Sequence, residues 1–186
     1  MRHAQPSAWL DSSKYSEQRA CTEYREGSSR RSVSLANWKS PSKRTYEDRL
    51  LLEYWQTFGG LLFTEVPVGR DGPKDWPEGA KPRRIDGVRI GSRGIETAPS
   101  DIVAFGKRRD AKRFERIVAG AEVEVVEVKR ALDRVVLGQV IIGSDLLEIE
   151  YAPNKIDQVV VCEKGDPVLQ MVCDRRGIKV WMPPKS

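Results

Sequence analysis

The sequence contains few of the residues that enzymes commonly use for nucleophilic and metal chemistry. It has one histidine, His3, and three cysteines, Cys21, Cys162 and Cys173. Because the histidine lies in the N-terminal tail, Ser-His-Asp, Cys-His and His-metal mechanisms are excluded for a folded domain. Three cysteines without CxxC spacing argue against a disulfide framework or a zinc site. We expect Cys162, in a predicted strand, and Cys173, in a predicted helix, to be buried reduced thiols. Hydrolytic chemistry would therefore depend on carboxylates and lysine.

Long apolar segments are also missing. No run approaches the roughly 20 residues that span a bilayer, and the start of the chain, MRHAQPSAW, lacks the apolar core of a secretory signal. We therefore expect a cytoplasmic protein without membrane contact. The net charge of +5 is compatible with a nucleic-acid partner, although it does not establish one.

The length of 186 residues suits one domain with a tail. Residues 1–43 are rich in Ser, Arg, Lys and Glu and have little periodicity. We expect a polar, basic N-terminal arm that is partly disordered or docked on a partner, with Trp9 and Trp38 as contact residues. Residues 44–186 form the predicted folded domain.

Periodicity predicts the elements of this domain. Apolar spacing indicates a helix over 45–58, with a capping signal from Thr45 and Asp48 and an end at Gly59. The expected strands are 61–69, 83–91, 121–129, 157–164 and 178–182, and the further helices are 132–151 and 166–176. The segment 92–121 has no clear assignment. The resulting order is α-β-β-β-α-β-α-β, and its βαβαβ half predicts parallel neighbouring strands.

The strand over 121–129 ends in two charged residues on its apolar face. Strand alternation places Glu127 and Lys129 on the same face as Val123 and Val125. Glu122, Glu124 and Val126 lie on the other face. Burial of a charge is costly unless the charge is paired or holds a metal. Glu127 and Lys129 lie about 6–7 Å apart along the strand, so a carboxylate and an ammonium can act on one substrate phosphate.

Asp86, in RRIDGV, supplies a second carboxylate on the preceding strand. Two carboxylates on adjacent strands can hold Mg²⁺, and a metal-bound water loses its proton more easily. Lys129 could orient or deprotonate that water, or stabilise the developing charge. Asp101, in APSDIV, is a rival for the second carboxylate; if it is the ligand, the segment 83–90 belongs to an outer hairpin. Asp86 is preferred because it lies on a recognisable strand.

This pattern resembles the PD-(D/E)XK nuclease superfamily over residues 45–182. The order is a helix with Glu, a hairpin with Asp, a strand with Glu-x-Lys, a helix with Gln, and a strand. The resemblance implies an α/β, restriction-endonuclease-like fold, with a mixed central sheet flanked by helices. It also implies that the catalytic residues are Asp86, Glu127, Lys129, Gln139 and Glu47, with Asp86 and Glu127 as metal ligands. Glu53 is a rival to Glu47 on the same helix, and the proline of the family motif is absent before Asp86.

The function implied by the resemblance is a Mg²⁺-dependent endonuclease, with Mn²⁺ as a substitute. DNA is favoured over RNA as its substrate, although the sequence does not distinguish the two. A homodimer is compatible with the pattern. Basic residues that could contact phosphates are Arg83, Arg84, Lys107, Arg108, Arg109, Lys112 and Arg113, although solvated positions explain them equally well. Two alternatives stay open: a non-cleaving nucleic-acid-binding module on the same fold, and an assembly factor that binds a protein through the arm over 1–43.

Overall fold

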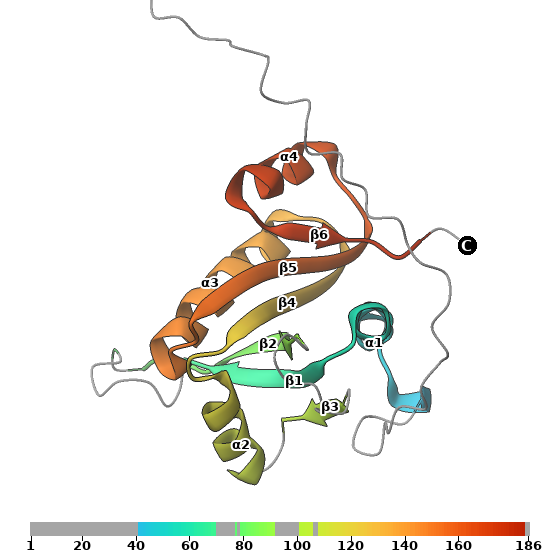
Figure 1. Ribbon diagram of the computed structural model, residues 1–186. Coiled ribbons are helices and arrows are strands. Elements are labelled where there is room, and N and C mark those ends of the chain that lie inside the picture. Colours follow the sequence, from blue (N-terminus) through green and yellow to red (C-terminus); the bar gives the residue numbers. More distant parts are fainter. Residues whose placement is uncertain (1–40, 70–76, 78, 92–100, 106–107, 185–186) are drawn as a thin grey trace, which may run out of the picture. The chain divides into compact units, whose positions relative to one another are not determined.

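The computed structural model describes residues 41–69, 77, 79–91, 101–105 and 108–184 (Figure 1), without the side chains of residues 41, 101 and 108–110. Most of the predicted arm over 1–43, including Trp9, Trp38 and Cys21, therefore lies outside the described residues. All described residues belong to one compact unit. No helix among them is long and apolar enough to cross a membrane.

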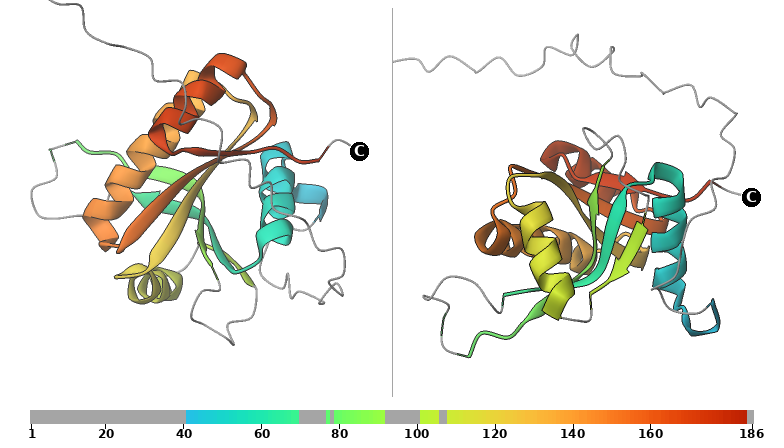
Figure 2. Two further views of the ribbon diagram at one scale, coloured as in Figure 1. Left: turned by 45° about the horizontal axis from the view of Figure 1, so that its top comes forward. Right: turned by 60° about the horizontal axis from the view of Figure 1, so that its bottom comes forward.

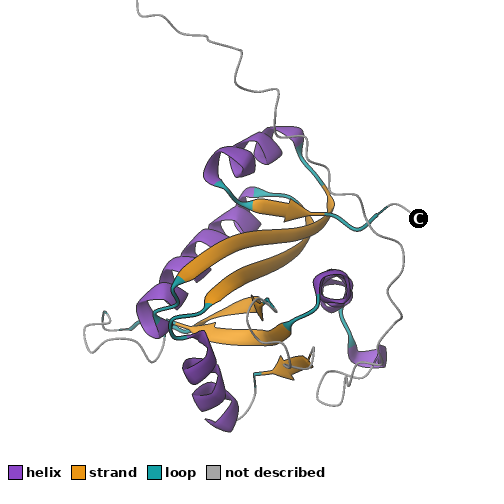
Figure 3. Cartoon of the chain, in the orientation of Figure 1, coloured by secondary structure: helices purple, strands orange, loops and turns teal. Residues whose placement is uncertain are grey.

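The fold is a six-stranded mixed sheet with helices on both faces (Figure 3). The elements in chain order are the short 3-10 helix η2 (Pro41–Lys43), α1 (Tyr46–Phe58), β1 (Leu61–Val68), β2 (Arg83–Ile90), β3 (Asp101–Ala104), α2 (Arg108–Val118), β4 (Glu122–Ala131), α3 (Arg134–Tyr151), β5 (Lys155–Lys164), α4 (Pro167–Arg176) and β6 (Lys179–Trp181). The order across the sheet is β3-β1-β2-β4-β5-β6. β2 is antiparallel to both β1 and β4, and the other neighbouring pairs are parallel.

The predicted order of elements is wrong in the segment 92–121. The structure has an additional strand, β3, and an additional helix, α2, between β2 and β4. Phe114 and Val118, four residues apart on α2, are fully buried, so this basic helix has a short apolar face. The parallel pairing of β4, β5 and β6 is confirmed. Cys162 and Cys173 are buried free thiols, as expected.

Helix α1 begins and ends where the sequence predicted. The Thr45 hydroxyl accepts a hydrogen bond from the Asp48 amide, and the Thr45 amide donates to the Asp48 carboxylate, which together form a capping box. Gly59 ends the helix with a φ of 65°, a conformation that glycine adopts without steric cost. These caps fix the first turn of α1, which carries Glu47.

The core has two layers, one on each face of the sheet (Figure 2). On one face, Leu51, Tyr54 and Trp55 of α1 pack against the sheet. On the other face, α2, α3 and α4 pack on an apolar cluster that includes Phe114, Leu147 and Cys173 in those helices. Both faces of the central strands are therefore covered, which is typical of strands with nearly continuous apolar sequence.

Candidate active site

Glu127 is buried in the middle of the sheet. Its side chain is 2% exposed, and it lies on the α3 side of β4 with Val123 and Val125, as strand alternation predicted. Opposite it, α3 has Gly143. A Cβ added at Gly143 would lie 3.6 Å from the Oε1 atom of Glu127 and 3.2 Å from Ile85. The missing side chain at Gly143 therefore makes room for the carboxyl group, a role that the sequence did not indicate.

Asp86 lies where β2 and β4 stop pairing. The register of the two strands ends at Gly87 opposite Val126. The Oδ2 atom of Asp86 then accepts a hydrogen bond of 2.8 Å from the amide of Val128. The Asp86 side chain also hydrogen-bonds the Glu127 side chain. The end of the ladder therefore brings the two predicted carboxyl groups into direct contact.

A break in the alternation of β1 directs polar residues of this strand toward Asp86. Glu65 has a φ of 58°, which is uncommon for a residue other than glycine. In the ladder between β1 and β2, Thr64 pairs with Gly87 and Val66 pairs with Ile85, whereas Glu65 has no pairing partner. Thr64, Glu65 and Asp86 consequently line one cavity of about 110 Å³ beside the first turn of α1.

Lys129 reaches the first turn of α1. Its Nζ atom lies 3.0 Å from the Oε1 atom of Glu47, although α1 packs on the face of the sheet opposite to the buried side chain of Glu127. The Lys129 and Glu47 side chains are 30% and 46% exposed, so the pair lies at the rim of the site. The structure therefore brings together four of the five predicted catalytic residues, Asp86, Glu127, Lys129 and Glu47.

The carboxyl pair has strongly altered proton affinities. Burial, followed by the charge of Asp86 and the hydrogen bond to it, raises the pKa of Glu127 from 4.5 to about 9. Burial also raises the pKa of Asp86, although the hydrogen bond from Val128 and the charge of Lys129 oppose this shift. In the absence of a cation, Glu127 is therefore protonated at neutral pH and donates its hydrogen bond to Asp86.

Lys129 keeps its positive charge in this environment. Burial acts to lower its pKa, but the hydrogen bond to Glu47 and the negative charges of Glu47, Asp86 and Glu127 outweigh burial and raise the pKa. Lys129 is consequently an ammonium group at neutral pH. Of the roles predicted for it, this charge favours orientation of water and stabilisation of negative charge over deprotonation of water.

Gln139 is exposed on α3, and its side chain makes no hydrogen bond with the described residues. It lies one helical turn before Gly143, on a similar side of the helix. Helix α3 follows β4 and runs in the opposite direction, with Gly143 opposite Glu127. One helical turn and two strand residues both span about 6 Å. Gln139, one turn before Gly143, is therefore near the level of Lys129, two residues after Glu127. It therefore borders the site without taking part in its hydrogen bonds.

The rival acidic residues lie elsewhere. Asp101 is the first residue of β3 and pairs with Leu61 of β1. Leu61 pairs with Ile90 of β2, and Ile90 pairs with Val123 of β4. Asp101 is thus three strands from β4, or about 14 Å across the sheet, and level with Val123 rather than Glu127. Glu53 is exposed on α1, six residues and about 9 Å along the helix from Glu47.

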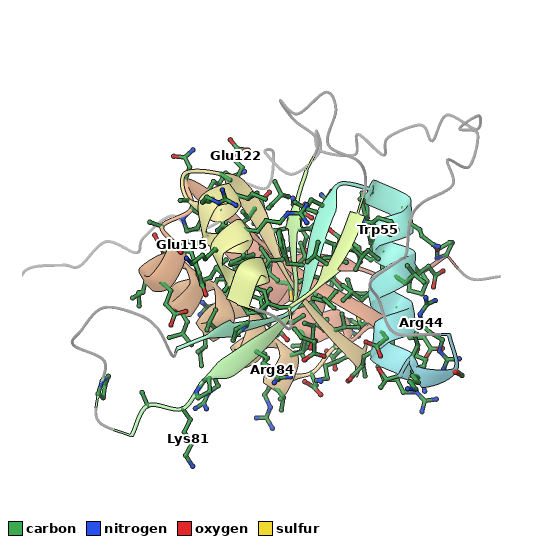
Figure 4. The ribbon with its side chains drawn as sticks, turned by 90° about the horizontal axis from the view of Figure 1, so that it is seen from below. Arg44, Trp55, Lys81, Arg84, Glu115 and Glu122 are labelled. Carbon is green, nitrogen blue, oxygen red and sulfur yellow. The ribbon has the colours of Figure 1, made fainter. Side chains whose placement is uncertain are left out.

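The predicted basic residues lie on the surface, as far as they are described. Arg83 is exposed, and Arg84 pairs with Glu65 at 3.4 Å with 71% of its side chain exposed. Figure 4 shows the side chains of Lys81 and Arg84 pointing away from the domain. Lys112 and Arg113 are exposed on α2. Arg108 and Arg109 begin α2 without described side chains, and Lys107 lies outside the described residues.

A second polar network was not expected from the sequence. Glu124, which alternation assigned to the opposite face from Glu127, accepts hydrogen bonds from Arg89 at 2.6 Å and Tyr54 at 2.7 Å. Burial acts to raise the pKa of Glu124, but these two hydrogen bonds outweigh it and lower the pKa. Its partners come from two other elements, α1 and β2, so no local pattern could have shown them.

A cavity of about 750 Å³ opens beside this network. Its three basic side chains are each paired: Arg89 with Glu124 at 2.6 Å, and Lys155 and Lys179 with Asp157 at 3.1 Å and 2.9 Å. The charges on its walls therefore compensate one another, and the network stabilises the junction of α1 with the sheet.

Comparison with protein-family models, with curated proteins and with solved structures finds no match to this chain. The case for a function therefore depends on the geometry of Asp86, Glu127, Lys129 and Glu47. Among the described residues, no group of three or more histidine, cysteine, aspartate or glutamate side chains is arranged to hold a metal ion. The predicted ligands, Asp86 and Glu127, form a group of two.

Proposed function

We propose that this protein is a divalent-cation-dependent nuclease that hydrolyses phosphodiester bonds, most of all those of DNA. The observation that carries the proposal is the contact between the carboxyl groups of Asp86 and Glu127 at the point where β2 and β4 separate, with the Lys129 ammonium group close enough to interact with both. Burial of a carboxyl pair opposes folding. Such pairs, with altered pKa values, are typical of functional sites. The mixed sheet, with α1 on one face and α3 on the other, agrees with the restriction-endonuclease-like core that the sequence resembles.

The donor set fits a magnesium ion. Mg²⁺ prefers oxygen ligands and is usually held by one or two carboxylates, with water and substrate phosphates completing its shell. Asp86 and Glu127 offer such a pair, and the pKa of Glu127 is raised to about 9 by burial first and then by the charge of Asp86, both of which a bound cation would offset. When bound there, the ion would supply a water of lowered pKa and would neutralise charge on the phosphodiester.

The side chains of the chain itself have distinct roles in this proposal. Asp86 and Glu127 hold the cation, and the Val128 amide fixes the carboxylate of Asp86. Lys129 orients the attacking water and stabilises the negative charge that develops on the phosphate. Glu47 keeps Lys129 protonated and holds its ammonium group at the rim of the site. Gln139 of α3 is exposed near the level of Lys129 and is assigned no direct role.

The proposed polymer contacts come from surface arginines near the site. Arg84 pairs with Glu65, which lines the cavity beside Asp86. Arg83 and Arg84 thus lie at the edge of the site and, with the net charge of +5, suit a phosphate backbone. The basic residues of α2 belong to the other face of the sheet, where α2 packs through Phe114, and they would contact only a long substrate.

A cleavage screen tests the proposal. Purified protein is incubated with circular, linear, branched and single-stranded DNA and with RNA, with Mg²⁺, with Mn²⁺ or with EDTA. We expect cation-dependent cleavage of at least one DNA substrate, and we expect Lys129→Ala to reduce the rate by at least about 10²-fold, because it removes a charge aimed at the transition state. Lys155→Ala is the matched control, since that lysine pairs with Asp157 away from the site.

Two results of this screen would contradict the proposal. Cleavage by Lys129→Ala at the wild-type rate would show that the assignment of the active site is wrong. Salt-sensitive binding of nucleic acid without cleavage under any cation would instead support the non-cleaving module.

A further inference from the structure

The outer side of α3 carries a stripe of exposed aliphatic side chains. Val135, Ile142 and Ile149 are 63%, 55% and 53% exposed. They are seven residues apart, so they lie almost in line along the helix. The inner side of α3 is apolar as well, because Val136 and Leu147 are buried against the sheet. Single exposed aliphatic residues are ordinary, but a helix that is apolar on both sides is typical of one with a partner on each side.

The stripe is complementary to itself. Ile142 lies midway between Val135 and Ile149. If a second α3 lies antiparallel with the two Ile142 residues in contact, Val135 of each copy faces Ile149 of the other. Such an arrangement is an isologous, twofold interface. Gly138 beside the stripe has no atom within 4 Å of the position that its Cβ would occupy, so it allows the second helix to approach closely.

The charges beside the stripe select an antiparallel second copy. Arg134, near the start of α3, and Asp145 and Glu148, in its second half, are all exposed. At about 100° of rotation per residue they share one flank of the stripe. Antiparallel packing places Arg134 of each copy near Asp145 and Glu148 of the other, whereas parallel packing sets this flank against the opposite flank of the partner and loses these pairs. The helix dipoles also favour the antiparallel arrangement.

We propose that the chain forms a twofold-symmetric dimer through antiparallel contact of its α3 helices, with Ile142 on the axis. α3 has 18 residues, and its contact face is about 27 Å long and 10 Å wide. This is less than the roughly 800 Å² that each partner buries in a standard stable interface. We therefore expect a weak dimer that dissociates on dilution. The interface uses the outer side of α3, whereas Glu127 lies buried on its inner side, opposite Gly143.

Disulfide cross-linking tests the geometry of the dimer. Full-length protein with Cys21→Ser receives a single cysteine at one stripe position and is oxidised mildly. We expect Ile142→Cys to cross-link rapidly on its own. Val135→Cys and Ile149→Cys should cross-link poorly alone and efficiently when the two variants are mixed. Rapid cross-linking of Val135→Cys with itself would indicate parallel packing and overturn the proposal, as would a failure of Ile142→Cys to cross-link.

Sedimentation equilibrium tests the energetics. We expect wild-type protein to dimerise at micromolar concentrations and Ile142→Asp to be monomeric. Arg134→Glu and Glu148→Arg should each weaken the dimer by about threefold to tenfold, and the double variant should recover most of the loss. Phe58→Asp, which alters an exposed apolar residue of α1, is the control and should dimerise normally. A wild-type protein that stays monomeric up to about 1 mM, or a double variant without recovery, would refute the interface.

Discussion

Glu127→Gln is expected to abolish cation-dependent cleavage, with a fall in rate of at least about 10³-fold, and to leave the fold intact. In the metal-free protein Glu127 is protonated and donates a hydrogen bond to Asp86. The amide of glutamine has the same shape and can donate the same hydrogen bond. It cannot become a carboxylate, however, so the cation loses a ligand. Metal-ion stabilisation of the transition state contributes several kcal/mol, and each 1.4 kcal/mol corresponds to about tenfold in rate.

Cleavage rates of the two proteins under Mg²⁺, together with their unfolding curves, check this expectation. The matched control is Glu122→Gln, which changes the same residue type at the exposed start of the same strand. It should cleave at the wild-type rate. If Glu127→Gln retained cleavage, the assignment of Glu127 as a metal ligand would be wrong. If the variant unfolded, the protonated, hydrogen-bonded state assigned to Glu127 would be wrong.

The stability of the metal-free protein is expected to fall as pH rises from about 5 to about 9. In the unfolded chain, a glutamate releases its proton near its ordinary pKa of 4.5, whereas Glu127 in the folded protein releases it only at about 9. Between these values the folded state holds a proton that the unfolded state has lost. The free energy of unfolding therefore decreases with pH, by up to about 1.4 kcal/mol per pH unit. The raised pKa of Asp86 acts in the same direction at the acidic end of this range.

Urea unfolding in EDTA at several pH values measures this slope. The slope should become much smaller in Glu127→Gln, because the titrating group is gone. Mg²⁺ should raise the stability of the wild-type protein most at alkaline pH, where the proton no longer competes for the carboxylate. A stability in EDTA that does not fall between about pH 5 and about pH 9, or that falls equally in Glu127→Gln, would contradict the raised pKa of Glu127.

Local patterns were sufficient to predict one half of the candidate site. Alternation in β4 placed Glu127 on an apolar face, and its side chain is 2% exposed there. The capping signal at Thr45 fixed the start of α1 and hence the position of Glu47. Both depend on residues within a few positions of one another, where strand and helix periods are reliable guides.

The other half depended on contacts between distant residues. The strand order favours Asp86 over Asp101 as the second carboxylate, since β2 adjoins β4 whereas β3 lies at the far edge of the sheet. Sequence spacing contains no direct information on that order. The contact of Lys129 with Glu47 joins residues 82 positions apart. The alternation break at Glu65 arises from its positive φ, which nothing in the residue type required.

The segment 92–121 was missed for a different reason. The cluster of basic residues and Gly106 hid a helical signal in α2, although Phe114 and Val118 had the spacing of a buried helix face. β3 has only four residues, which is too short for alternation to be distinguished from chance. Its position on the edge of the sheet, parallel to β1, could be seen only from the fold.

Binding of Mn²⁺, followed by electron paramagnetic resonance, tests most directly whether the carboxyl pair is a metal site. The account predicts that wild-type protein binds the ion and that Asp86→Asn and Glu127→Gln each reduce the affinity by at least about tenfold. Asp101→Asn, the rival carboxylate, should bind the ion like the wild type. Wild-type affinity in Asp86→Asn, or loss of binding in Asp101→Asn alone, would contradict the account.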